Sequence, residues 1–244
     1  MTTEPGDAVG TFRALHHGRA PEEPLVLPGP WDAASARVFV EAGFAALATP
    51  SAGVATALGY ADGATPADEM FAAVARIVRS VDVPVSADLE GGYGLSPKEL
   101  VGRALDAGAV GVNLEDSGPG KVLKEPHRHA DWLAEVRAEA GGALFLNARV
   151  DTFLRGVTDP VAAVERALLY VAAGADCVYP IGAPPEALCV LREAVSGPIN
   201  VGMGQDGPDV AGWGRLGATR ITFGPGLLLR TLDAVRALAS SLRT

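Results

Sequence analysis

The chain has 244 residues, of which 48% are hydrophobic, and carries a formal net charge of −9 at pH 7. Such an acidic chain argues against binding of nucleic acids or anionic membrane surfaces by charge alone. No uncharged apolar run is long enough to span a bilayer, and Cys177 and Cys189 give neither a disulfide framework nor zinc spacing. The first residues lack the basic and apolar regions of a signal peptide, so we expect a cytoplasmic protein.

Short apolar segments alternate with helical patterns along the whole chain. A leading helix is expected over residues 7–19. Strands are expected over residues 25–27, 45–48, 84–87, 111–114, 144–146, 176–179, 199–201 and 220–223. Helices are expected over residues 33–42, 66–80, 96–107, 130–140, 160–173, 184–195 and 208–216, with a last helix that ends near residue 242. Residues 54–65 are expected to form a long connection.

The recurring unit is a helix, a glycine stop and an apolar strand of about four residues. It is seen in EAGFAALA, DAGAVGVNLE, AAGADCVYP and RLGATRITF. About eight such units in succession predict an α/β protein with a single (β/α)8 TIM-type barrel domain over residues 1–244. The alternative is an open doubly wound sheet, against which the absence of GxGxxG after the first strand speaks.

Acidic side chains gather at the expected carboxyl ends of neighbouring strands, where barrels place their reacting groups. Asp88 and Glu90 end the motif VPVSADLEGGYG, and Glu115 follows the next strand. A cation would relieve their mutual repulsion, and hard oxygen ligands suit Mg²⁺ or Mn²⁺. Asp62 is a candidate for the outer shell of the same ion. The alternatives are helix capping or solvated loop positions for these acids, and a salt bridge or turn for Asp116.

Arg149 and Asn147, after the fifth strand, are candidates for contact with an anionic substrate. A guanidinium offers planar donors to a carboxylate or to a developing enolate oxygen. The alternative for Arg149 is a buried ion pair with Asp151 or a neighbouring acid. Asn147 could orient the substrate or satisfy backbone groups.

Two loops complete the set of candidates. The small residues Ser51, Ala52 and Gly53 follow the second strand, and their backbone N–H groups could hold a carboxylate. Residues 117–129 form a long polar segment that carries Lys121 and Lys124. It could be a lid over the site or a solvated surface loop. We do not expect the two histidines of this segment to bind a metal.

Six motifs occur in order between residues 25 and 182: PGPWDAASARVFVEAGFAALATPSAG, LGYADG, VPVSADLEGGYG, GVNLEDS, LFLNARVDTFL and GADCVYPIG. On these motifs the chain resembles the isocitrate lyase/phosphoenolpyruvate mutase superfamily, and within it the short phosphoenolpyruvate mutase-like branch. The resemblance implies a (β/α) barrel whose last helix is exchanged between subunits, in a homodimer or homotetramer. It also implies a Mg²⁺-bound 2-oxo acid or its enolate.

The resemblance also implies a role for individual positions. On the metal side it implies Asp88 as the main acid, Glu90 and Glu115 as holders of metal waters, and Asp62 in the outer shell. On the substrate side it implies carboxylate binding by Ser51 and Gly53, a flanking Trp31, and enolate stabilisation by Arg149. Lys121 falls near a lid position that is catalytic in some members.

The lid segment SGPGKVLKEPHRH departs from the resembling families. It has neither the cysteine motif of isocitrate and methylisocitrate lyases nor the Lys-Thr-Asn-Ser motif of phosphoenolpyruvate mutases. The sequence therefore suggests a Mg²⁺-dependent carbon–carbon lyase of a small 2-oxo or 2-hydroxy carboxylate, with Tyr93, a lid residue or water as proton donor. The alternatives are a mutase or hydrolase of a phosphonopyruvate-type substrate, and a non-catalytic 2-oxo acid binding protein.

Overall fold

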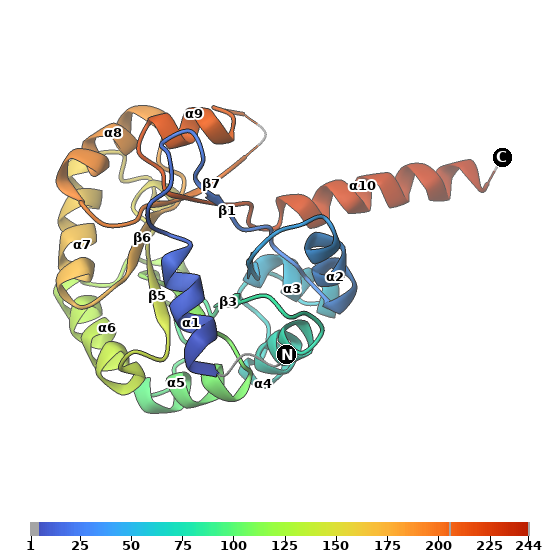
Figure 1. Ribbon diagram of the computed structural model, residues 1–244, viewed down its shortest axis with the longest axis horizontal. Coiled ribbons are helices and arrows are strands. Elements are labelled where there is room, and N and C mark those ends of the chain that lie inside the picture. The colour runs from blue at the N-terminus through green and yellow to red at the C-terminus, as the bar shows by residue number, and fades with distance from the viewer. Residues whose placement is uncertain (1–4, 205, 244) are drawn as a thin grey trace.

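The computed structural model describes residues 5–204 and 206–243, and this part of the chain is an α/β fold with parallel strands (Figure 1). The strands are β1 (Leu25–Val26), β2 (Leu47–Ala48), β3 (Val85–Asp88), β4 (Gly111–Glu115), β5 (Phe145–Val150), β6 (Cys177–Pro180), β7 (Asn200–Gly202) and β8 (Arg220–Thr222). The α-helices are α1 (Pro5–Ala14), α2 (Ala33–Glu41), α3 (Ser51–Leu58), α4 (Ala67–Val78), α5 (Pro97–Asp106), α6 (Pro126–Ala140), α7 (Pro160–Ala172), α8 (Pro185–Ala194), α9 (Val210–Arg215) and α10 (Gly226–Ser241).

The strands form two parallel sheets, ordered β2-β3-β4-β5-β6 and β1-β8-β7. The sheets approach each other at both edges. A parallel bridge pairs Val178 with Ile199, and the Ala48 N–H donates to the Pro28 carbonyl at 3.1 Å. Strand order follows chain order in the larger sheet, whereas a doubly wound sheet reverses its order at a switch point. The doubly wound alternative is therefore not found.

The core is aliphatic and lies between the strands and the surrounding helices. Its strand residues include Leu47, Val85, Val112, Leu146, Val178 and Ile221, all buried. Several helices end at a glycine with positive φ, as the repeated pattern predicts. At Gly108, with φ 79°, a Cβ would lie 2.9 Å from the Val78 Cγ1, so this stop also requires glycine for packing.

Helix α1 covers the amino ends of the strands, on the side opposite to the strand ends that carry the acids. Phe12 packs edge-to-face on Phe145 with a centroid distance of 5.2 Å, and His16 stacks on the same ring at 4.2 Å. Phe12 belongs to a second apolar cluster, separate from the main core, together with Phe145 and Cys177, the first residues of β5 and β6. The carboxyl ends are left for polar side chains.

Three predicted elements differ from the structure. The leading helix ends at Ala14 instead of residue 19, and the chain then tightens into a turn in which the N–H groups of His16 and His17 donate to the Arg13 and Ala14 carbonyls. Residues 51–58 form helix α3 rather than part of a connection, because the extended Pro50 starts a helix that Gly59 ends at φ 89°. Helix α6 begins at Pro126, earlier than expected, because the Glu125 side chain caps it through the amides of His127 and Arg128. The histidines of the polar segment therefore lie on a helix.

Helix α10 projects away from the rest of the protein (Figure 1). Its apolar side chains Leu229, Val235 and Leu238 are exposed. None of the helices in the described residues combines the length and the apolar character needed to traverse a lipid bilayer.

Candidate active site

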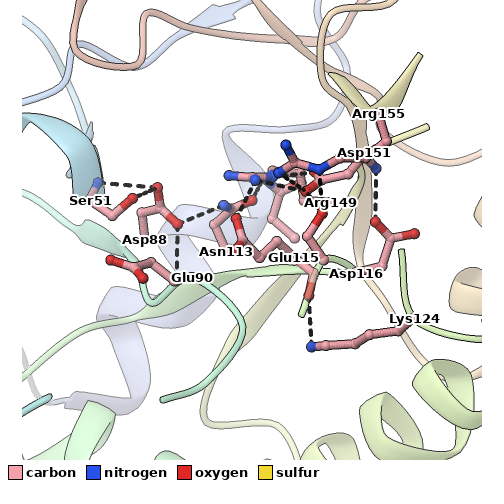
Figure 2. Close-up of polar contacts among 12 residues, drawn as sticks. Ser51, Asp88, Glu90, Asn113, Glu115, Asp116, Lys124, Arg149, Asp151 and Arg155 are labelled. Carbon is pink, nitrogen blue, oxygen red and sulfur yellow. Dashed lines mark hydrogen bonds and ion pairs between the residues drawn. The ribbon is translucent and has the colours of Figure 1, made fainter. Parts of the chain in front are cut away.

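Asp88, the last residue of β3, is the centre of a hydrogen-bond cluster at the carboxyl ends of the strands (Figure 2). Its Oδ2 accepts from the Ser51 backbone N–H at 3.1 Å and from the Ser51 hydroxyl at 2.7 Å. Its Oδ1 accepts from the Asn113 amide at 2.9 Å and from the Glu90 N–H at 3.3 Å. Donors from three elements therefore fix the orientation of this carboxylate.

Glu90 lies in the glycine-rich turn that follows β3, with a left-handed φ of 51°. Non-glycine residues adopt this conformation at an energetic cost, and such strain is concentrated at functional sites. Burial, and then repulsion by Asp88 and Asp62, raise the pKa of Glu90 to about 7. Within the described residues its Oε1 is buried without a hydrogen-bond partner. Asp62 is exposed, and its charge reaches Glu90.

Glu115 and Arg149 lie directly opposite each other on β4 and β5. The Arg149 Nη2 forms an ion pair with the Glu115 Oε2. Burial nevertheless raises the pKa of Glu115 to about 7, although Arg149 lowers it, and Asp88 adds repulsion. The guanidinium is thus placed between the acids of the site.

Asp151 supplies the second partner of Arg149. Its carboxylate accepts from the Arg149 Nε at 2.5 Å and from Nη2 at 2.9 Å. Burial alone would lower the pKa of Arg149, but Asp151 and Glu115 raise it. Asp151 is itself held by the Ser117 hydroxyl and by Arg155. The predicted ion pair of Arg149 with Asp151 is therefore present, and it orients the guanidinium at the strand ends.

Asp116 points to the opposite face of β4 from Glu115 and is fully buried. It accepts from the Asp151 N–H at 2.8 Å, the Tyr170 hydroxyl at 2.7 Å and the Arg166 Nη1 at 2.9 Å. Of the two roles predicted for Asp116, the structure shows the salt bridge. This network ties the end of β5 to α7, and sequence analysis found none of its partners on α7.

Asn147 and Asn113 extend the cluster across the strands. The Asn147 amide donates to the Asn113 Oδ1 at 3.0 Å, and Asn113 in turn donates to Asp88. Both side chains are buried. Asn147 therefore orients Asn113, a residue that the sequence analysis did not single out. A polar residue between two apolar residues of a strand, as Asn113 is on β4, was the sequence signal that could have identified it.

The amino end of α3 faces the Asp88 carboxylate through Ser51. The first intrahelical bond runs from the Val54 N–H to the Pro50 carbonyl at 2.9 Å, so the amides of Ala52 and Gly53 precede the hydrogen-bonded turn. A Cβ on Gly53 would lie 2.8 Å from the Pro50 Cγ, so glycine is needed here. These amides are available to donate to an anionic group.

Trp31 lies close to this helix end, half-buried after β1. A Cβ on Gly53 would lie 3.8 Å from the Trp31 Cβ, which shows how near the two backbones are. The indole packs edge-to-face on Phe39 at a centroid distance of 6.3 Å. Trp31 can therefore form an apolar wall beside the α3 amides.

Residues 117–123 form a short closed hairpin instead of a long loop. Ser117 and Leu123 make an antiparallel bridge, and the Gly118 N–H donates to the Val122 carbonyl at 2.8 Å. Lys121 lies exposed at its turn with φ 61°. The structure therefore does not bring Lys121 into contact with the acids described above.

Lys124, rather than Lys121, is the lysine that reaches the site. Its Nζ donates to the Glu115 carbonyl at 3.1 Å and lies 5.2 Å from the Trp132 ring centroid. In Figure 2, Lys124 approaches Glu115 from the side opposite to Arg149. Burial lowers the pKa of Lys124. It steadies the end of β4 without facing the substrate side.

The acids fit a hydrated cation better than a directly ligated one. Within residues 5–204 and 206–243, no three His, Cys, Asp or Glu side chains converge to hold a metal ion. Asp88, Glu90 and Glu115 repel one another, and one buried oxygen of Glu90 lacks a partner. Mg²⁺ typically binds through one or two carboxylates and keeps several waters. This donor set is compatible with Mg²⁺.

Sequence comparisons extend over almost the whole chain. The sequence model of the family described as phosphoenolpyruvate phosphomutase matches residues 12–243. An uncharacterised protein of Mycobacterium tuberculosis (strain ATCC 25618 / H37Rv) is 33% identical over 216 residues, which cover 88% of this chain and 81% of that protein. The 2-methylisocitrate lyase of Aeropyrum pernix is 33% identical over 182 residues, which cover 69% of this chain and 56% of the enzyme.

Solved structures share the same fold. A protein of Burkholderia cenocepacia J2315, provisionally named a phosphonomutase, has a TM-score of 0.90 at 38% identity, covering 96% of this chain and 99% of its own. A 2,3-dimethylmalate lyase has a TM-score of 0.83 at 25% identity, covering 97% of this chain and 87% of its own. A phosphonopyruvate hydrolase with bound oxalate and Mg²⁺ has a TM-score of 0.86 at 19% identity, which shows the fold alone.

Proposed function

Because the chain belongs to the phosphoenolpyruvate phosphomutase family, we propose that it is a Mg²⁺-dependent lyase. It cleaves or forms a carbon–carbon bond in a small 2-oxo or 2-hydroxy carboxylate through an enolate. One observation carries the proposal above all. The buried Arg149 guanidinium is fixed by Asp151 beside three acids that repel one another. Two relatives, a 2-methylisocitrate lyase and a 2,3-dimethylmalate lyase, bear names of this reaction class.

The residues at the carboxyl ends divide into two groups by what they would hold. Asp88 would hold the ion, Glu90 and Glu115 would hold its waters, and Asp62 would add negative charge from outside. When bound, Mg²⁺ supplies the positive charge that the oxygens of a 2-oxo acid require. The amides of Ala52 and Gly53 would hold the substrate carboxylate, flanked by Trp31. Ser51, predicted to bind the same group, instead donates its N–H and hydroxyl to Asp88. Asn147 keeps Asn113 on Asp88.

Arg149 is placed to stabilise the enolate. Its remaining donors face a mouth lined by carboxylates, so an oxygen that gains negative charge during bond cleavage is attracted to it. Since Asp151 holds the guanidinium before any substrate arrives, little reorganisation is needed during the reaction. Glu115 is the candidate base, because its carboxylate lies at the strand ends directly beside the Arg149 guanidinium.

The proton balance then assigns one further side chain. Cleavage of a 2-hydroxy acid transfers the hydroxyl proton to a base and leaves a carbonyl and an enolate, which takes up a proton at carbon. Tyr93 follows Glu90 in the same turn, and its hydroxyl carries a proton near neutral pH, although burial and then the Glu90 charge raise its pKa and make it a weaker acid. Tyr93 is thus our candidate donor. Lys121 could replace it only after movement of the 117–123 hairpin.

The finer architecture belongs to the same proposal. We propose that the two sheets close into a (β/α)8 barrel, supported by the Val178–Ile199 bridge and the hydrogen bond from Ala48 to Pro28. We also propose that α10 packs against a second copy of the chain, in a homodimer or homotetramer. Its projection from the protein and its exposed Leu229 and Leu238 support this arrangement.

The test is turnover of a panel of 2-oxo and 2-hydroxy di- and tricarboxylates with Mg²⁺. We expect product from at least one acid, and loss of product in both Asp88→Ala and Arg149→Ala. No turnover across the panel, with ligand binding retained, would instead indicate a binding protein without catalysis.

A second candidate is phosphorus–carbon bond chemistry. It is favoured by the family name and by the relative at 38% identity that is provisionally named a phosphonomutase. Phosphorus NMR of the protein with phosphonopyruvate separates the two candidates, because a mutase or hydrolase shifts the phosphorus resonance and a carbon–carbon lyase leaves it unchanged.

A further inference from the structure

A cavity of about 360 Å³ lies at the end of the protein opposite to the acids. Its walls come from the segment after α1, the loop between α8 and β7, and the turn between α9 and β8. These segments are at the amino ends of β1, β7 and β8, whereas Asp88 and Arg149 are at the carboxyl ends. Figure 1 shows the chain after α1 running toward α9. The cavity is therefore separate from the candidate active site.

The side chains around this cavity are basic, although the protein carries a net charge of −9. The lining includes His16, His17, Arg19 and Arg192, and within the described part of the chain it contains no Asp or Glu. The acids of the adjacent loop, Glu22 and Glu23, are exposed and do not line it. The charged side chains that line the cavity, Arg19 and Arg192, are thus both cationic.

His16 presents a buried nitrogen that lacks a partner. The side chain is 3% exposed, and its Nδ1 lies 2.7 Å from the Phe12 carbonyl, whereas Nε2 has no hydrogen bond in the described residues. Burial, and then the charge of Arg220, lower the pKa of His16 to about 3. A bound anion would favour the protonated ring, in which Nε2 donates as well.

Arg220 does not line the cavity, but its charge acts on His16, and it is 1% exposed. Its guanidinium is 5.9 Å from the Phe12 ring centroid, and its Nε and Nη1 have no hydrogen-bond partner among the described residues. Burying the guanidinium costs free energy and lowers the pKa of Arg220, and the charge of Asp88 offsets this cost only in part. A nearby anion would offset that cost.

Arg192 is a half-buried cation of the cavity lining. Its side chain packs against Gly217, which has a φ of 108°. A Cβ at Gly217 would overlap the Arg192 Cγ, so the glycine leaves room for the arginine side chain. Its guanidinium makes neither a hydrogen bond nor an ion pair with the described residues. Its position in the last turn of α8 complements the helix dipole, but that role does not account for Arg220 or the His16 Nε2.

We infer that this cavity is a binding site for a phosphate group, carried by free phosphate or by a small phosphate monoester. Guanidinium donors match phosphate oxygens, and the two arginines of the lining, Arg19 and Arg192, suit an anion with more than one negative charge. The cavity is larger than a phosphate ion and lies in the usual size range of small-molecule sites. The monoester would thus place its phosphate among the basic side chains and its remainder in the same cavity.

The test is calorimetric titration of the full chain with inorganic phosphate and, separately, with glycerol 3-phosphate. We expect one saturable site, with the affinity reduced about tenfold or more in Arg192→Gln, because a charged donor to phosphate is lost. Arg37→Gln, which removes an exposed arginine on α2, is the matched control and keeps the affinity. Arg149→Gln also keeps it, because that residue lies at the other end of the protein.

Tighter binding of glycerol 3-phosphate than of phosphate would identify the monoester as the ligand class, and equal binding would identify the phosphate group alone. Three results would overturn the inference. They are no binding of either compound up to about 10 mM, equal affinity in Arg192→Gln and wild type, and loss of binding in Arg149→Gln. Acetate binding as tight as that of phosphate would also contradict a site for a doubly charged anion.

Discussion

The Asp151 carboxylate holds the Arg149 guanidinium through both of its oxygens, with N–O distances of 2.5 and 2.9 Å. The two residues are on the same strand end, and Asp151 is fully buried. The orientation of Arg149 is therefore decided by a residue that itself has no access to the substrate.

Asp151→Asn is expected to lower kcat by about 10²-fold while changing KM little. The substitution leaves Arg149 misaligned, and a misaligned guanidinium stabilises the transition state less. Steady-state kinetics on the best substrate of the panel would measure this split. Asp82→Asn, at an exposed position without a hydrogen bond in the described residues, is the control. A rise in KM at constant kcat would contradict the positioning role of Asp151.

Glu90→Gln is expected to stabilise the protein at pH 8 by about 1–2 kcal/mol, since a partly buried charge is removed. The pKa of Glu90 is raised from 4.5 to about 7 in the folded protein, so its favourable contribution is complete below pH 4.5 and is lost as the pH rises through 7. At pH 4.5 the variant and the wild type should differ little.

Urea unfolding without Mg²⁺ at both pH values measures the difference in the free energy of unfolding. Glu135→Gln changes an exposed acid on α6 and serves as the control. Equal effects of Glu90→Gln at the two pH values would show that the charge of Glu90 is not destabilising.

Removal of Mg²⁺ with EDTA is expected to lower the Tm, because a ligand that binds only the folded state at about 100 times its Kd stabilises by about 2.7 kcal/mol. Asp88→Asn should abolish the Mg²⁺-induced shift, and the exposed Asp131→Asn should retain it. Scanning calorimetry with and without Mg²⁺ measures both. A full shift in Asp88→Asn would place the ion elsewhere.

Leu238→Glu is expected to shift the protein from an oligomer to a monomer, since the change puts a charge on the exposed apolar face of α10. Size-exclusion chromatography with light scattering gives the molar mass. Val161→Glu, at an exposed apolar position on α7, controls for the added charge. A wild-type monomer at all concentrations would refute the exchange of α10.

Much of the arrangement follows from the alternation of short strands and helices. Because parallel strands in sequence order lie side by side, strand-end residues such as Asp88, Glu115 and Arg149 are predictable as neighbours. The structure places Glu115 directly opposite Arg149. Their roles in binding and catalysis stay predictions.

Other features depend on contacts that no local pattern contains. Asp116, for example, accepts hydrogen bonds from Arg166 and Tyr170. These two residues are about fifty positions further along the chain, on α7. Helix α3 has small residues without a polar face, so periodicity does not reveal it. The hairpin that displaces Lys121 is likewise closed by backbone bonds, which residue identity alone does not specify.

The closed hairpin at residues 117–123 bears on substrate range. A segment that is already folded loses little conformational entropy when a substrate binds. Fewer protein–substrate contacts are then needed to offset that loss, so the whole length of the acid need not be contacted. Because this hairpin need not refold on binding, acids of different chain length can present the same carboxylate to the amides of α3. We therefore expect broad tolerance for the distal end of the substrate.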